Sequence, residues 1–183
     1  MNDFRRAVEL KYRLMPYVYT QAADCSANGL PMLRALFVKY PNDPASWLVE
    51  DEYMFGSDLL GAPLYESGTS GHKVSFPPGT WIDYQIGSEY EGEKWFDIQT
   101  RNTHGAREGT AIPHIGLAQS TEDMDWSKLE LVVYGNPNKV SGLLRLPDSN
   151  TIHTLNVEQS GGSYSLVGNP PREAIVTVRK FGN

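Results

Sequence analysis

Three consecutive acidic residues are the first groups in this sequence that could do chemistry. Glu50, Asp51 and Glu52 stand together, and Asp58 and Glu66 follow nearby. Two carboxyl groups about 5 to 5.5 Å apart can act as nucleophile and acid/base in hydrolysis. Neighbouring acids on a short helical turn point in different directions, however, and near a helix start the helix dipole stabilises them. We therefore expect these side chains to be solvated or to cap a helix.

A single arginine interrupts an apolar run. Arg34 lies within residues 31–38, which are otherwise mostly apolar. A buried guanidinium must be paired with a carboxylate or with carbonyl groups. We expect Arg34 to make a structural tie rather than to contact a ligand.

The other possible ligands and nucleophiles are too isolated to form a recognisable site. Compact zinc sites place two histidines three or four residues apart with a third ligand, whereas those in this chain are scattered: His72, His104, His114 and His153. Cys25 has no dedicated histidine or asparagine signature, so we expect an ordinary thiol. The glycine pairs at 68–71 and 161–162 do not open helices, which argues against a phosphate-binding loop. The sequence predicts no catalytic, cofactor-binding or metal-binding residue and no cofactor.

Aromatic residues make up 11% of the chain and offer a different kind of site. Their faces can stack on sugar rings, so a carbohydrate-binding module is an alternative. Most of them alternate within expected strands or line the expected helix, as packing requires. The residues whose exposure distinguishes the two alternatives are Trp47, Trp81, Trp95 and Trp126.

Composition excludes several classes of partner. The chain has 183 residues and a formal net charge of −6, which is unsuitable for binding a phosphate backbone, so no nucleic-acid partner is expected. Its apolar runs fall far short of the ~20 residues that a membrane span requires, and residues 1–6 lack the apolar region of a signal peptide. We expect a soluble chain with no membrane partner, from a cytoplasmic or periplasmic protein.

The elements that must position any site change in kind along the chain. Apolar residues recur at helical spacing over residues 4–24, with a kink expected at Pro16 and a stop at Asn28-Gly29. Residues 31–38 are typical of a buried strand. From Leu59 onward, short apolar or alternating runs are separated by turn residues, as in antiparallel sandwiches. These runs are residues 59–64, 73–76, 81–84, 94–99, 128–134, 142–146, 152–157, 163–167 and 174–179.

Residues 101–125 are the least periodic part, so we place a boundary between two β-modules near residues 116–127. One helix and one buried strand cannot form a parallel α/β layer by themselves, because such strands need neighbours and helices on both faces. The first fifty residues are therefore typical of the end of a larger α/β domain.

Three stretches together resemble the C-terminal part of glycoside hydrolase family 31, the α-glucosidases and α-xylosidases. They are ELKYRLMPYVY at 9–19, GLPMLRALFVKYP at 29–41 and DEYMFGSDLLGAP at 51–63. Residues 78–92, PGTWIDYQIGSEYEG, are similar to a hairpin that follows in the family. Further on, 107–113 keep only the Arg-x-Gly-x-x-Ile-Pro end of the next family strand, and 146–150 are a remnant of its Tyr-Glu-Asp-Asp-Gly hairpin.

The resemblance implies a mainly β fold with parts of a larger enzyme. Residues 1–56 would be the incomplete end of a (β/α)8 catalytic barrel, 57–117 a proximal β-sandwich and 118–183 a distal one, both small and antiparallel. The family's nucleophile lies in a W-x-D-M-N strand end and its acid/base follows an R-S-G segment, and this sequence contains neither. The chain would thus be a structural fragment of a retaining α-glycosidase, inactive alone, whose partner is the remaining barrel and possibly an oligosaccharide. The alternative is a stand-alone carbohydrate-binding or interaction sandwich.

Overall fold

The chain folds into two compact units. The structure, a computed structural model, describes residues 2–65, 68–99 and 102–181. The first unit combines the N-terminal helices, up to Asn28, with Gly109–Phe181, and we call it the helix–sandwich unit. The second is Gly29–Glu108, which we call the sheet unit. No helix in the described ranges is long and apolar enough to cross a membrane.

Two helices replace the single kinked helix expected from the sequence. Helix α1 spans Asn2–Arg13 and α2 spans Met15–Asn28. The interruption at Leu14 has a physical cause, because Pro16 has no N–H and its ring would collide with the carbonyl four residues earlier. Gly29 follows α2 with a φ of 70°, the left-handed conformation that ends a helix without strain.

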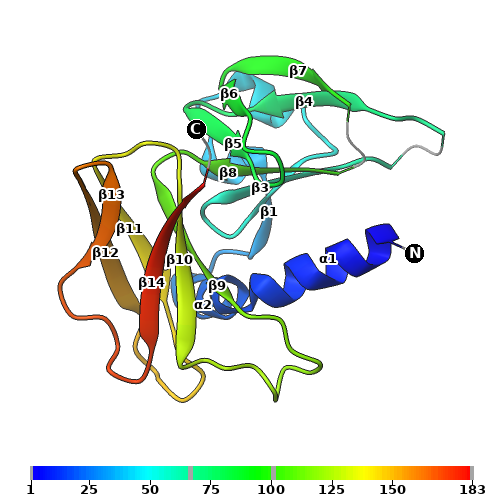
Figure 1. The fold of residues 1–183 in the computed structure, drawn as a ribbon. Helices are drawn as coiled ribbons and strands as arrows, with labels where there is room; N and C mark the ends of the chain where they lie inside the picture. Colours follow the sequence, from blue (N-terminus) through cyan, green and yellow to red (C-terminus); the bar gives the residue numbers. More distant parts are fainter. Residues whose placement is uncertain (1, 66–67, 100–101, 182–183) are drawn as a thin grey trace. The chain divides into compact units, whose positions relative to one another are not determined.

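Six strands form two three-stranded sheets in the helix–sandwich unit (Figure 1). One sheet has the order β14-β10-β9 and the other β11-β12-β13. Strands β10 and β14 run parallel, whereas the other pairs in this unit are antiparallel. The sequence predicted antiparallel strands throughout this module, and the parallel pair of β10 and β14 differs from that prediction. The bounds are β9 Thr110–Ile115, β10 Lys128–Tyr134, β11 Lys139–Leu144, β12 His153–Ser160, β13 Ser163–Val167 and β14 Ile175–Phe181.

The core of this unit lies between its two sheets. Leu131 and Leu155, one from each sheet, are buried together with other aliphatic residues of both. Tyr12 of α1 and Met15 of α2 pack against the same core, and α2 contacts β9 and β11. The helices therefore belong to this sandwich within the chain, because they cover apolar surface that would otherwise face water.

The sheet unit is built around one larger sheet. Its six strands have the order β1-β2-β3-β8-β5-β6, with all pairs antiparallel, and β4 and β7 form a separate two-stranded antiparallel sheet. The strand bounds are β1 Leu33–Ala35, β2 Tyr53–Phe55, β3 Leu59–Pro63, β4 His72–Phe76, β5 Thr80–Asp83, β6 Glu89–Glu91, β7 Lys94–Ile98 and β8 Asn102–Arg107, and the short helices are α3 Leu36–Lys39 and the 3₁₀ helix η1 Pro44–Trp47.

Aromatic rings dominate the core of the sheet unit. Trp81 and Phe76 are fully buried, with ring centroids 6.2 Å apart. Phe76 also stacks on Tyr90 and meets Phe96 edge to face, at 4.8 and 5.8 Å. Such rings remove large apolar areas from water, so this cluster contributes to the stability of the unit.

The predicted mainly β fold is confirmed, while several details differ. Strands β10 and β13 have the predicted bounds. Residues 31–38 contain only three strand residues before α3 begins, and β1 pairs antiparallel with β2 rather than within a parallel layer. Along the chain, the second compact unit ends at Glu108, and Gly109 begins the segment that contains β9, which pairs with β10. The division into modules at 57 and 118, which refers to a parent enzyme, stays a prediction.

Candidate functional site

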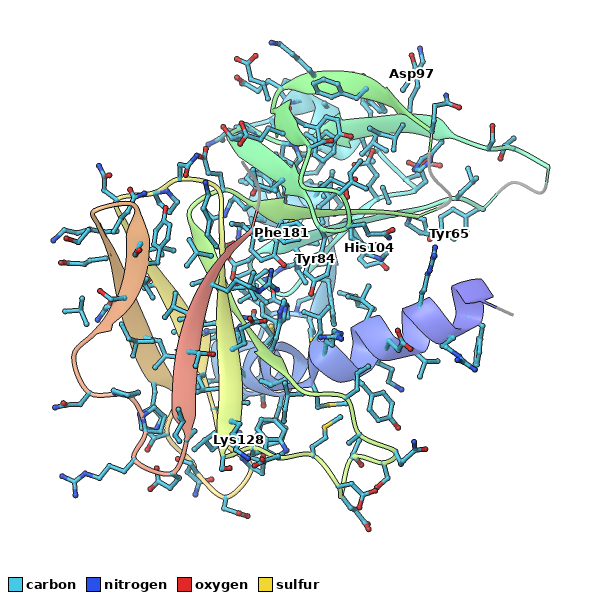
Figure 2. All side chains as sticks on the ribbon, in the orientation of Figure 1. Tyr65, Tyr84, Asp97, His104, Lys128 and Phe181 are labelled. Carbon is cyan, nitrogen blue, oxygen red and sulfur yellow. The ribbon has the colours of Figure 1, made fainter. Side chains whose placement is uncertain are left out.

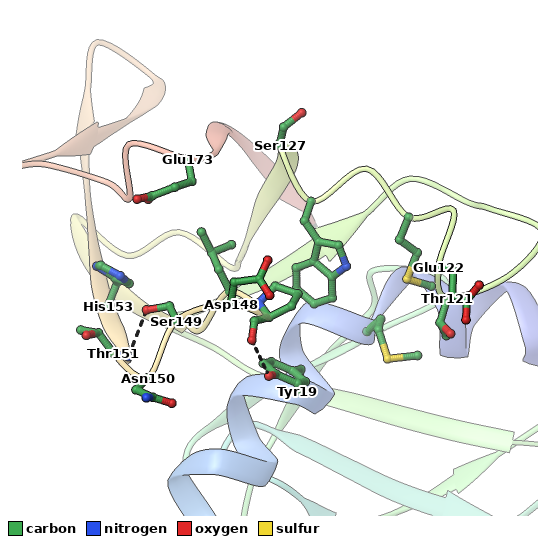
Figure 3. A pocket seen from close by; sticks show the side chains of 15 residues that line it. Tyr19, Thr121, Glu122, Ser127, Asp148, Ser149, Asn150, Thr151, His153 and Glu173 are labelled. Carbon is green, nitrogen blue, oxygen red and sulfur yellow. Dashed lines mark hydrogen bonds between the residues drawn. The ribbon is translucent and has the colours of Figure 1, made fainter.

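An open groove of about 1010 Å³ lies in the helix–sandwich unit (Figure 3). Its walls come from three parts of the chain: α2, residues 121–127 before β10, and residues 146–153, which lead into β12. Glu173, which precedes β14, also lines the groove. The volume is at the upper end of the range for small-molecule pockets. This groove is a candidate for a ligand site.

Helix α2 and the segment after β11 are fastened together at one wall. The Tyr19 hydroxyl donates to the carbonyl of Pro147 at 3.0 Å, and the backbone N–H of Arg145 donates to Thr20 Oγ1 at 2.8 Å. The Arg145 guanidinium lies over the Tyr19 ring, 5.3 Å from its centroid, and its Nε donates to the Ser149 carbonyl at 2.8 Å. These contacts hold residues 145–149 against the helix and fix the shape of the wall.

An aromatic side chain, Trp126, contributes to the apolar surface of the groove. Trp126 is half-buried and packs against the unit's core, and it meets the ring of Tyr19 edge to face at 5.8 Å. The turn that carries it is held by Asp125, whose Oδ1 accepts from the backbone N–H of Ser127 at 3.1 Å. The Trp126 ring is therefore anchored by these contacts and also lines the groove.

The lining also contains polar and acidic side chains, beside the apolar residues Met15, Met124, Leu146 and Pro147. Glu122, Asp148 and Glu173 are exposed carboxylates, and His153 is a half-buried imidazole. The lining includes no lysine or arginine among the described residues. The groove can thus offer hydrogen-bond acceptors and donors beside an aromatic face, and its charge disfavours anionic ligands.

Arg34, the buried arginine noted in the sequence, ties a turn of the sheet unit. Its Nη2 donates to the carbonyl of Gly56 at 2.6 Å, and the ammonium of Lys39 donates to the carbonyl of Ser57. Arg107 Nη2 lies 3.1 Å from Asp58 Oδ1. Three basic side chains therefore hold the β2–β3 turn, which supports the structural interpretation of Arg34.

The charges at this turn alter the titration of neighbouring groups. Burial, together with the guanidinium groups of Arg107 and Arg34, lowers the pKa of Lys39 to about 8, while Asp58 acts in the opposite direction. Burial raises the pKa of Tyr40. Lys39 is still mainly protonated at neutral pH, so it continues to serve as a donor in the tie.

The acidic run at 50–52 contains one buried and two exposed side chains. Glu50 and Asp51 are exposed, whereas Glu52 is 4% exposed and accepts from the backbone N–H of Ser75 at 2.7 Å. Burial raises the pKa of Glu52 to about 8, with Asp51 adding to the effect and the Ser75 hydrogen bond opposing it. Glu66 lies outside the described residues. Glu50 and Asp51 are exposed as expected, whereas the expectation that all three acids are solvated or cap a helix is wrong for Glu52, which is buried and bonded to strand β4.

Glu52 should make the stability of the sheet unit depend on pH. Its folded pKa is raised above the ordinary value of 4.5, so its contribution is complete below about 4.5 and is lost as pH rises through about 8. Between pH 6.5 and 8 we expect the free energy of unfolding to fall by about 1–2 kcal/mol, since each pKa unit corresponds to about 1.4 kcal/mol. Urea unfolding followed by tryptophan fluorescence at the two pH values measures this.

The Glu52→Gln variant should abolish this pH dependence, while Glu50→Gln, at an exposed position, should retain it. Two other groups of the unit with shifted pKa values change its stability mainly outside the range from pH 6.5 to 8. Burial lowers the pKa of His104 below its usual 6.5, which affects stability only at lower pH, and the lowered pKa of Lys39 acts above about 8. An equally steep fall in Glu52→Gln would contradict the assignment.

The four histidines and Cys25 lie on different elements or segments of the described chain. No group of three potential ligands among His, Cys, Asp and Glu comes together within the described ranges. Burial lowers the pKa of His114 to about 4. His104 lies beside the end of β5, where its carbonyl accepts from the backbone N–H of Tyr84 at 2.7 Å (Figure 2). Cys25 is a buried thiol on α2.

The four tryptophan side chains differ in their exposure to solvent. Trp81 is fully buried, while Trp47 and Trp95 are 59% and 51% exposed. The indole N–H groups of Trp47 and Trp81 donate to the carbonyls of Pro41 and Pro77. Trp126 is the member of the set that lines the groove. Sequence reasoning singled it out as an aromatic to check, but nothing in the sequence brought residues 19, 126 and 148 together.

Comparisons with known proteins agree on one family. A model described as the C-terminal domain of glycosyl hydrolase family 31 matches residues 29–128. Alpha-glucosidase 2 of Bacillus thermoamyloliquefaciens is 29% identical over 151 residues, which cover 80% of this chain and 19% of that protein. Lysosomal alpha-glucosidase of Mus musculus is 37% identical over 188 residues, covering 89% and 19%. The chain thus spans about a fifth of the length of these curated relatives.

A solved structure gives the same result. The Flavobacterium johnsoniae dextranase of this family, complexed with glucose, matches with a TM-score of 0.78 and 28% identity over 90% of this chain and 24% of the other. The family model alone covers more than half of the sequence. The resemblance noted in the sequence is therefore confirmed, and this chain belongs to glycoside hydrolase family 31.

Proposed function

We propose that the chain serves as the C-terminal structural part of a retaining α-glycoside hydrolase that acts on α-linked glucosides or xylosides. The observation that carries this proposal is the match of residues 29–128 to the family's C-terminal domain. The relatives include α-glucosidases of which the chain spans about a fifth. The catalytic barrel would be supplied by polypeptide outside these 183 residues.

Exposed apolar side chains on the N-terminal elements support a missing partner. Phe4 at the start of α1 is 77% exposed. In the sheet unit, Trp47 is also exposed and stacks on Phe37 with ring centroids 4.7 Å apart. Apolar surface of this kind commonly marks an interaction site. We assign it to contact with the remaining barrel, of which residues 1–56 would be the end.

The chain alone should not hydrolyse glycosides. The nucleophile and acid/base motifs of the family, W-x-D-M-N and R-S-G, do not occur in the sequence, and a retaining mechanism needs both carboxyl groups. We expect purified chain to release no nitrophenol from p-nitrophenyl α-glucoside or α-xyloside above the rate without protein. Hydrolysis that copurifies with the chain and scales with its concentration would overturn the proposal.

A barrel-binding role requires a second measurement. We expect co-expression with a barrel polypeptide encoded upstream to yield a complex that copurifies with the chain and hydrolyses the same substrates. Phe4→Ser and Trp47→Ser should weaken that association, while Trp95→Ser, at a comparably exposed position, should not. Unchanged association in both of the first variants would contradict the assigned surface.

A further inference from the structure

The groove of the helix–sandwich unit has features that its structural role does not require. It is concave, it carries one aromatic side chain anchored by Tyr19, and its wall is fixed by the contacts of Arg145. Pockets that bind small molecules combine an apolar surface with a few positioned polar groups. The groove has both.

Several polar groups of the lining have unused hydrogen-bonding capacity. Within the described part of the chain, no other residue forms a hydrogen bond with the indole N–H of Trp126, the carboxylates of Asp148 and Glu173 or the ring of His153. Asn150, by contrast, accepts from Arg145 Nη2 at 3.3 Å. The free set includes a donor, acceptors and an imidazole that can act as either.

These features together define the ligand class. We propose that the groove is a binding site for a neutral oligosaccharide, with one sugar ring against Trp126 and hydroxyl groups bonded to Asp148, His153 and Glu173. Hydroxyl groups donate and accept, so they match a mixed set of partners. The aromatic face and the fixed wall supply a preformed surface, which lowers the ordering cost of binding.

Other ligand classes fit the groove less well. A phosphate or a uronic acid would meet three carboxylates and no basic side chain in the described lining. A polyamine would use the acceptors but leave the indole N–H and the imidazole donor unused. The Tyr19 ring, a possible second aromatic platform for a cation, is already covered by Arg145.

The indole N–H signals of ¹⁵N-labelled chain provide a direct test with maltotriose and isomaltotriose as probes. Four tryptophans give four signals, and two of these N–H groups, in Trp47 and Trp81, already donate within the chain. We expect the Trp126 signal to shift saturably, with a Kd of about 1 mM. Exposed Trp95, in the other unit, is the internal control and should not shift.

Variants separate a groove site from nonspecific contact. Trp126→Ala should remove saturable shifts of the backbone signals of residues 148–151, and Asp148→Asn should weaken binding about threefold to tenfold, as expected for one hydrogen bond. Trp95→Ala should bind as the parent chain does. Because Trp126 also contacts the core, exposed Asp148 keeps the test valid if Trp126→Ala fails to fold.

Three results would overturn the proposal: no saturable shift with either sugar, equal shifts of Trp95 and Trp126, or stronger binding of spermidine than of sugar at the same residues. The proposed function guides only the choice of α-glucosides as probes. The two fail separately, because binding is read from these signals in chain alone, whereas the proposed function is read from hydrolysis and association.

Discussion

Replacing Trp81 with alanine should destabilise the sheet unit by about 3–5 kcal/mol, the usual cost of deleting a buried large aromatic side chain. Trp81 is fully buried, and its ring lies near those of Phe76 and Tyr40, at 6.2 and 6.5 Å. Its indole N–H donates to the Pro77 carbonyl at 2.8 Å. The variant loses the apolar contacts, leaves a cavity and removes the partner of a buried carbonyl group.

Chemical unfolding followed by far-UV circular dichroism measures the effect, and the chain supplies a matched control. Trp95 lies in the same unit on β7 and is 51% exposed, so Trp95→Ala should change the free energy of unfolding by no more than about 0.5 kcal/mol. Equal unfolding midpoints for the two variants would show that Trp81 does not anchor this core.

Strand prediction succeeded where local pattern and tertiary burial agree. Residues 163–167 alternate in burial and follow Gly161-Gly162, so the pattern located β13. Strand β9 was missed because all six of its residues are buried and it contains Pro113, which removes an N–H and obscures a strand pattern. Proline is tolerated there because β9 is an edge strand of its sheet.

The groove could not be predicted for a different reason. The segments that form its walls are far apart in the sequence. Tyr19 and Pro147, for example, are joined by a hydrogen bond although more than a hundred residues separate them. Loop residues such as Asp148 show no periodicity that would place them. For Arg34, the sequence predicted that a buried guanidinium needs a partner. It could not identify that partner, the Gly56 carbonyl, because only the folded chain brings the two residues together.

Gly142→Ala should destabilise the helix–sandwich unit by about 2–3 kcal/mol, at the upper end of the cost of overpacking. Gly142 lies on β11, and a Cβ at this position would be 2.2 Å from the Ala111 carbonyl oxygen on β9. It would also be 3.1 Å from Leu131 Cδ1. The oxygen belongs to a backbone paired with β10, so it cannot rotate away as a flexible side chain would. The absence of a side chain therefore allows the strands of the two sheets to approach closely.

Gly116→Ala is the matched control, because a Cβ at that position meets nothing within 4 Å and its backbone is not left-handed. Thermal unfolding of the two variants compares them directly. We expect Gly116→Ala to melt near the parent chain and Gly142→Ala several degrees lower, with a smaller folded population at any given urea concentration. If both alanines are tolerated equally, β11 and β9 are not in the close contact described, and the position of α2, which packs on the same two strands, would have to be revised with them.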